Sequence, residues 1–159
     1  MTQKSQVEPL AKTLIFGYTA RMDQSITACA FVHKNGRLFI AKRADTKIFL
    51  PEKFELPGGH IEFGEDIMAG LKREFKEELG LEIRVGNPFY AFTYVSGDKH
   101  VIEVDYFAEL ADPNVDIKLN PEDHSEFRWV TEEEVDEVWD KNDDEYKAVK
   151  KGFTLLGKQ

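Results

Sequence analysis

The order of apolar and polar positions along the chain predicts a mixture of strands and helices. Apolar residues dominate Ile26–His33 and Arg37–Lys42, and the Asn35-Gly36 dipeptide between these segments favours a tight hairpin turn. Four further strands are predicted, at Ile83–Val85, Phe89–Val95, His100–Leu110 and Phe127–Val130. Pro88 is expected to separate the first two of these four, because proline cannot donate to a strand ladder.

Three segments carry the signals of helices. Asp66–Leu79 is apolar at helical spacing and is followed by Gly80, the residue best suited to a left-handed C-cap. Thr131–Glu134 has the arrangement of a capping box, and Asp144–Leu156 is predicted as a last amphipathic helix. The chain before the first helix is expected to be a loop that ends at Pro57–Gly59. Because strands and helices do not alternate strictly, the pattern indicates an α/β (α+β mixed) fold with helices on the faces of a central mixed sheet.

The length of 159 residues fits one ordinary domain. Residues 25–159 hold the predicted elements, and residues 1–24 are interpreted as an N-terminal extension. This extension has a polar start and then the apolar run Thr13–Tyr18, which could add an edge strand or a dimer contact.

Composition and charge exclude several classes of protein. The formal net charge of −9 argues against a protein that grips a nucleic acid polymer, since that requires a basic surface. Cys29 is the only cysteine, so neither an internal disulfide nor a thiolate cluster for zinc is expected, and we predict that it is buried. No segment approaches the roughly 20 apolar residues that cross a bilayer, and the start lacks the apolar core of a secretory signal. We therefore expect a cytoplasmic protein with no membrane contact.

The segment from residue 66 to 79 carries the candidate chemistry. On a helix its apolar residues fill one arc, formed by Ile67, Met68, Leu71, Phe75 and Leu79. Glu74, Glu77 and Glu78 cluster at the edge of that arc, and Arg73 flanks them. Such runs usually form a solvated face. Because carboxylates at this spacing repel one another, a hard divalent cation with oxygen ligands is the alternative explanation.

A longer pattern favours the second explanation. Gly59 is followed after five residues by Glu65, and after seven more by Arg73–Leu81, which reads REFKEELGL. A chance match to this pattern has a probability of about 10⁻⁷. The pattern resembles, without a departure, the signature of the Nudix hydrolases, MutT-like enzymes that cleave a diphosphate linkage in nucleoside diphosphate-X compounds. The resemblance implies an α/β/α sandwich for the chain from residue 25 onward.

The resemblance also implies roles for individual residues. Glu74, Glu77 and Glu78 would bind the metal, Mg²⁺ or alternatively Mn²⁺, together with the main-chain carbonyl of Gly59. Glu65 and Arg73 would support these ligands.

The general base varies among such enzymes. Glu74 is the first choice here and Glu126 the rival, although Glu126 could also be a metal ligand or an ordinary surface acid. Arg43, at the end of the second strand, would contact substrate phosphate, the alternative being a surface charge. Asn142 is predicted as the N-cap of the last helix rather than as a base contact. The histidines lack metal-ligand spacing; they are His33, His60, His100 and His124.

The substrate is less defined than the class of reaction. The size and MutT-like layout favour a nucleoside triphosphate, cleaved to the monophosphate and pyrophosphate. An NDP-sugar or another NDP-X compound is the alternative, and a non-catalytic nucleotide-binding protein on the same fold is another. Many relatives are dimers, so a homodimer is the expected assembly.

Overall fold

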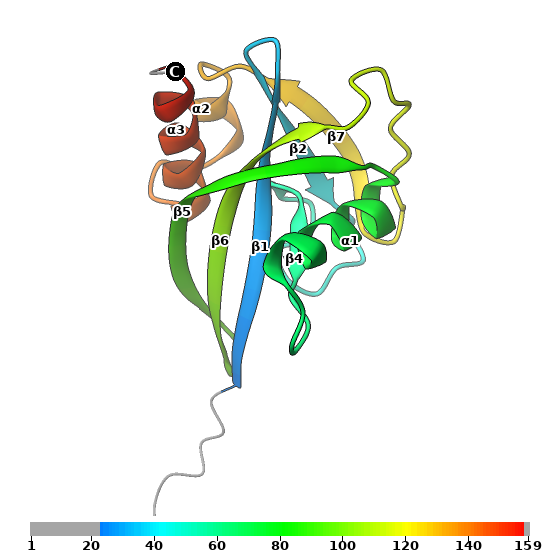
Figure 1. Ribbon diagram of the computed structural model, residues 1–159. Helices are drawn as coiled ribbons and strands as arrows, with labels where there is room; N and C mark the ends of the chain where they lie inside the picture. The colour runs from blue at the N-terminus through cyan, green and yellow to red at the C-terminus, as the bar shows by residue number, and fades with distance from the viewer. Residues whose placement is uncertain (1–22, 158–159) are drawn as a thin grey trace, which may run out of the picture.

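A seven-stranded mixed sheet with helices on both faces forms the fold (Figure 1). The computed structural model describes residues 23–157. Its strands are β1 (Asp23–Lys34), β2 (Arg37–Arg43), β3 (Phe54–Glu55), β4 (Gly58–His60), β5 (Ile83–Ser96), β6 (Lys99–Leu110) and β7 (His124–Val130). Its helices are α1 (Ile67–Leu79), α2 (Val135–Val138) and α3 (Asp144–Leu156). The mixed sheet and flanking helices confirm the predicted fold class.

Strand β1 lies at the centre of the sheet and organises it. The main path runs β3-β2-β1-β6-β5, while β4 pairs with β1 and β7 pairs with β2. Only the β1–β6 pairing is parallel among the pairings described for residues 23–157. The predicted hairpin between β1 and β2 is confirmed, with positive φ at Asn35 (51°) and Gly36 (74°).

The boundaries of several strands differ from the prediction. The predicted break at Pro88 is wrong, because β5 continues past this residue. The pairing of β5 with β6 is irregular between Val85 and Tyr90, and at such a bulge the strand does not require an N–H from the proline. The predicted loop before α1 contains the short strands β3 and β4, and β7 begins at His124 rather than Phe127. Thr13–Tyr18 lies outside the described residues.

Two apolar cores lie on opposite faces of the sheet, since successive side chains of β1 alternate between them. Ala28 and Ala30 face the core beneath α1, whereas Cys29 and Phe31 face the core beneath α3. Helix α3 comes close at Gly152, where an added Cβ would lie 2.6 Å from the Phe31 ring. The predicted burial of Cys29 is confirmed, with 7% of the residue exposed.

The helices largely follow their sequence signals. The Asp66 side chain accepts a hydrogen bond from Ala69 N at the start of α1, and Gly80 (φ 65°) forms the left-handed cap at its end. Met68, predicted to be apolar core, is instead 37% exposed, because the buried stripe runs through Gly70 and Leu71.

The N-caps of α2 and α3 differ from the prediction. The two hydrogen bonds of the predicted capping box are present, from Thr131 N to Glu134 Oε2 (2.7 Å) and from Glu134 N to Thr131 Oγ1 (3.4 Å). They close a turn before α2 rather than cap it, because the N-cap of α2 is Glu134, which makes no side-chain cap. The cap of α3 is Asp143 and not Asn142, whose side-chain amide donates to Asp140. Among residues 23–157, no helix combines the length and apolar character needed to cross a bilayer.

Candidate active site

The loop before α1 brings Gly59 directly against the acidic helix. Gly59 lies in β4 opposite Ala28 of β1, and hydrogen bonds from Ala30 N to Pro57 O and from Ile61 N to Ile26 O hold both ends of this strand. A Cβ atom at Gly59 would lie 2.4 Å from Glu74 Cδ. Glycine is therefore required for the approach of this carboxylate to the β4 backbone.

Arg73 holds three of the signature glutamates in place. Its guanidinium donates to both Glu65 oxygens (2.9 Å each), to Glu74 Oε1 (2.8 Å) and to Glu77 Oε2 (3.2 Å). The hydrogen bonds from Arg73 hold the pKa of Glu65 down at about 2. Glu65 is thus a permanent carboxylate, and it fits against α1 because Gly70 leaves room there, as a Cβ would lie 2.7 Å from its Oε2.

Glu78 faces a different neighbourhood, on the side of β3 and β7. Burial, together with the nearby charges of Asp123, Glu74 and Glu55, raises the pKa of Glu78 to about 8. Lys47 opposes that effect and forms an ion pair with Asp123. Carboxylates from α1 itself, from β3 and from the loop before β7 therefore lie near Glu78.

His124 is the central residue of this convergence, and sequence reasoning missed it. It is 2% exposed; its Nε2 lies 2.9 Å from Glu55 Oε1, and its Nδ1 lies 3.7 Å from Glu78 Oε2. The other Glu55 oxygen accepts from Arg43 Nη1 (2.8 Å). A chain of polar side chains thus runs from Glu78 through His124 and Glu55 to Arg43. The contacts depend on the pairing of β7 with β2, in which His124 lies opposite Arg43, and no sequence spacing signals that pairing.

The oxygen groups of α1 fit a hard divalent cation. Glu74 and Glu78 have side chains only 13% and 19% exposed, and Glu77, 60% exposed, continues the row toward solvent. Gly59, whose carbonyl is the fourth predicted ligand, lies in direct contact with Glu74. Carboxylates are the donor type that Mg²⁺ or Mn²⁺ prefers. Within residues 23–157, however, Glu74, Glu77 and Glu78 do not bring one oxygen each within 4.8 Å of one another.

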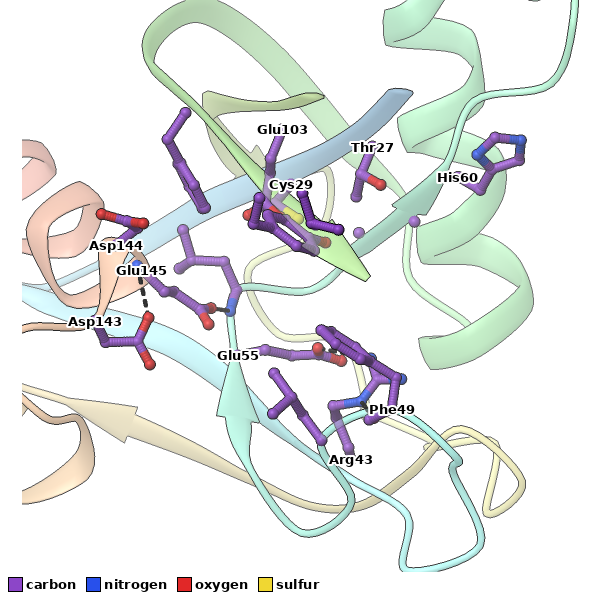
Figure 2. A pocket seen from close by; sticks show the side chains of 17 residues that line it. Thr27, Cys29, Arg43, Phe49, Glu55, His60, Glu103, Asp143, Asp144 and Glu145 are labelled. Atoms are coloured by element: carbon purple, nitrogen blue, oxygen red, sulfur yellow. Dashed lines mark hydrogen bonds and ion pairs between the residues drawn. The ribbon is translucent and has the colours of Figure 1, made fainter. Parts of the chain in front are cut away.

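A cavity of about 430 Å³ opens beside Gly59 (Figure 2). Arg43, Phe49 and Glu55 line one side of it, and Glu103 and Glu145 line the other. At its rim the Phe49 ring stacks on Tyr94, with centroids 6.0 Å apart and planes 8° apart. A flat aromatic pair beside polar groups can hold a planar heterocycle.

The two predicted site residues outside α1 and its preceding loop, Glu126 and Arg43, lie in different surroundings. Glu126 lies on β7 rather than in a loop, and it pairs with Arg128 (2.6 Å). Within residues 23–157 no hydrogen bond or ion pair joins Glu126 to α1. Arg43, in contrast, lies at the wall of the cavity, where it also donates to Phe49 O (2.9 Å).

The fold and the carboxylate-rich helix are those expected of a hydrolase of phosphoric anhydrides. The chain belongs to the Nudix family, since the sequence model of the NUDIX domain matches residues 23–151. This confirms the family indicated by the Gly59–Leu81 motif. The protein is therefore a Nudix hydrolase that acts on nucleoside diphosphate derivatives, small molecules that enzymes of this family generally process with divalent metal ions.

Individual relatives agree with this assignment. The nucleoside triphosphatase NudI of Escherichia coli O81 (strain ED1a) is 29% identical over 123 residues, which cover 72% of this chain and 86% of the relative. The crystal structure of a MutT protein from Methanosarcina mazei Go1 superposes with a TM-score of 0.73 at 21% identity, covering 87% of this chain and 99% of that one. An Ap4A hydrolase from C. elegans superposes with a TM-score of 0.67 at 18% identity, covering 86% and 99%. The two structures show the same fold.

Proposed function

We propose that this protein is a Mg²⁺-dependent hydrolase that converts a nucleoside triphosphate to the monophosphate and pyrophosphate. The observation that carries the proposal is the contact of Glu74 with Gly59, beside a cavity large enough for a nucleoside. The relative named nucleoside triphosphatase supports this choice of substrate.

The proposed metal ligands are Glu74, Glu77 and Glu78, with the carbonyl of Gly59. When bound there, Mg²⁺ would neutralise phosphate oxygens and the charge that develops on the leaving pyrophosphate. Arg73 and Glu65 hold the proposed ligands in position, since Arg73 donates hydrogen bonds to Glu65, Glu74 and Glu77. Arg73 therefore restricts the positions of Glu74 and Glu77, and its positive charge reduces the repulsion between their carboxylates.

Glu74 is the proposed general base. One of its oxygens accepts from Arg73, and the other lies against Gly59, toward the cavity wall. Its carboxylate would accept a proton from the attacking water, whose oxygen bonds to the α-phosphorus as the bond to the bridging oxygen breaks. Glu126 is the weaker candidate because it lies on β7, is not among the residues that line the cavity, and has no hydrogen bond or ion pair to α1 within residues 23–157.

Arg43 is proposed to contact a substrate phosphate. Its side chain is 22% exposed and lines the cavity, and its hydrogen bonds to Glu55 and Phe49 O fix the plane of the guanidinium. A guanidinium held in this way offers its remaining N–H groups in a defined direction. Cytoplasmic residence and a homodimer stay predictions from the sequence.

The test is turnover of a panel of dNTPs, NDP-sugars, ADP-ribose and dinucleoside polyphosphates, with Mg²⁺ and with excess chelator. We expect a nucleoside triphosphate to yield monophosphate and pyrophosphate, only with metal present. Reaction in ¹⁸O-water should place the label in the monophosphate, because water attacks the α-phosphorus. Preferred cleavage of an NDP-sugar would replace the proposed substrate, and nucleotide binding without turnover would indicate a binding protein.

A further inference from the structure

A second cluster of metal-binding groups lies away from α1, on the opposite face of the sheet. Cys29 of β1 and Asp105 of β6 are direct partners in the parallel register, and Glu103 lies two residues before Asp105. The sulfur and one oxygen from each carboxyl lie within 4.8 Å of one another. All three residues are buried, with exposures of 7%, 8% and 0% for Cys29, Glu103 and Asp105.

Asp105 is the member of this cluster that lacks a partner. Both of its carboxyl oxygens are buried, and neither has a hydrogen-bond partner among residues 23–157. A buried polar group without a partner destabilises the folded state, and a charged one does so more strongly. Burial accordingly raises the pKa of Asp105 to about 8, with the charge of Glu103 as a second cause. An acid is therefore kept in the interior without a contact that explains it.

We propose that Cys29, Glu103 and Asp105 form a second cation site, selective for a thiophilic divalent ion such as Zn²⁺ or Cd²⁺. One thiolate with two carboxylates is a softer donor set than the oxygen-only groups of α1, and a zinc-type ion suits it better than Mg²⁺. The site goes beyond the proposed hydrolysis, which needs only the carboxylates of α1.

The proton balance of binding follows from the contacts. The Cys29 thiol donates a hydrogen bond to Glu103, and burial raises the pKa of Cys29 well above its usual value. Binding would replace the thiol proton, and any proton on the two carboxyls, with bonds from the ion to Sγ and oxygen. The displaced protons pass to solvent, and no oxidation or reduction occurs.

The cavity gives an ion a route to this cluster. Cys29, Glu103, Thr27 and Tyr94 all line it, and Figure 2 shows Cys29 beside Glu103. Asp105, which is fully buried and lies opposite Cys29 in the β1–β6 pairing, would bind the ion from the interior side. Three protein ligands leave one position of a tetrahedral ion open toward the cavity.

The test uses the full chain, freed of metal by chelation and returned to buffer with excess Mg²⁺, which occupies the oxygen-only groups. Cd²⁺ is then added while the ultraviolet thiolate-to-cadmium charge-transfer absorption is followed. We expect the band to saturate at one equivalent. Cys29→Ser should abolish it, and Asp105→Asn should weaken the apparent Cd²⁺ affinity about tenfold or more. Glu77→Gln is the matched control, and its band should be unchanged.

Two results would overturn the proposal. One is the absence of a saturating band in the wild-type chain. The other is a band that survives both Asp105→Asn and Glu103→Gln, which would show a lone thiol reacting with cadmium. Circular dichroism of each variant checks folding, and Glu103→Gln tests the carboxylates if Asp105→Asn fails to fold. Because the readout is spectroscopic, it is independent of hydrolysis and of the identity of the substrate.

Discussion

Gly59 and Glu74 are in such close contact that no side chain fits between them. A Cβ on Gly59 would lie 2.4 Å from the Glu74 carboxyl carbon and 2.5 Å from its Oε2. Real Cβ atoms essentially never approach so closely, so any substitution at Gly59 must displace Glu74 or the β4 backbone. The glycine of the Nudix signature therefore has a steric role in this protein.

Gly59→Ala is expected to lower kcat roughly 10²-fold, because a 1 Å displacement of a catalytic group can cost that much. The fold should survive, since Glu74 lies at the edge of the core and can shift. The measurement is steady-state turnover of the preferred substrate, with circular dichroism as the check on folding. Gly157→Ala is the control, as its Cβ would meet only Phe153 O at an ordinary 3.7 Å. Equal activity of both variants would contradict the steric role.

Glu77→Gln should reduce turnover roughly 10²-fold or more and leave the free energy of unfolding nearly unchanged. The side chain is 60% exposed and bonded only to Arg73, so its removal takes away a proposed metal ligand rather than core packing. Turnover and urea unfolding of the same preparation measure the two effects. Glu82→Gln, which removes an exposed carboxylate paired with Lys76 just past α1, should be neutral in both. An unchanged rate for Glu77→Gln would remove it from the site.

His124→Leu should raise the Mg²⁺ concentration needed for half-maximal activity and lower kcat, by about 10–100-fold together. Leucine fills a similar buried volume, but it leaves Glu55 without its hydrogen bond to the imidazole Nε2 and removes the imidazole next to Glu78. Titrating activity with Mg²⁺ separates this positioning role from a general loss of stability, which would leave the metal dependence unaltered. The control is His100→Leu, a half-buried histidine at the start of β6.

The stability of the metal-free protein should fall as the pH rises from about 5 to about 8. The pKa of Asp105 is raised from 3.8 to about 8, and that of Glu103 from 4.5 to about 7, so the folded chain binds these protons more tightly than the unfolded chain. Their contribution is complete below the unfolded pKa values and is lost as pH rises through the folded ones.

Urea unfolding in chelator measures this effect, with Asp105→Asn as the comparison. The variant should gain roughly 2–5 kcal/mol relative to wild type between about pH 5 and pH 9, at about 1.4 kcal/mol per pKa unit. Parallel stability curves for the two proteins would show that Asp105 is ionised in the fold or has an unseen partner.

The sequence determined the parts of the site that depend on local geometry. Helical periodicity places Glu74, Glu77 and Glu78 along one edge of α1, and the Arg73 contacts with Glu74 and Glu77 lie within a single turn. The caps of α1 and the hairpin at Asn35-Gly36 are equally local, because only a few residues tolerate their backbone angles. These features were predictable for that reason.

Only the tertiary structure decided which distant residues join them. His124 reaches Glu55 and Glu78 because β7 pairs with β2, and Asp105 lies opposite Cys29 because β1 pairs with β6 in parallel. Strand pairing is chosen by the burial of both faces of the whole sheet, and no short stretch of sequence encodes it. For this reason the sequence predicted the carboxylates along α1, whereas only the fold showed that His124 lies beside them and that Glu103 and Asp105 lie next to Cys29.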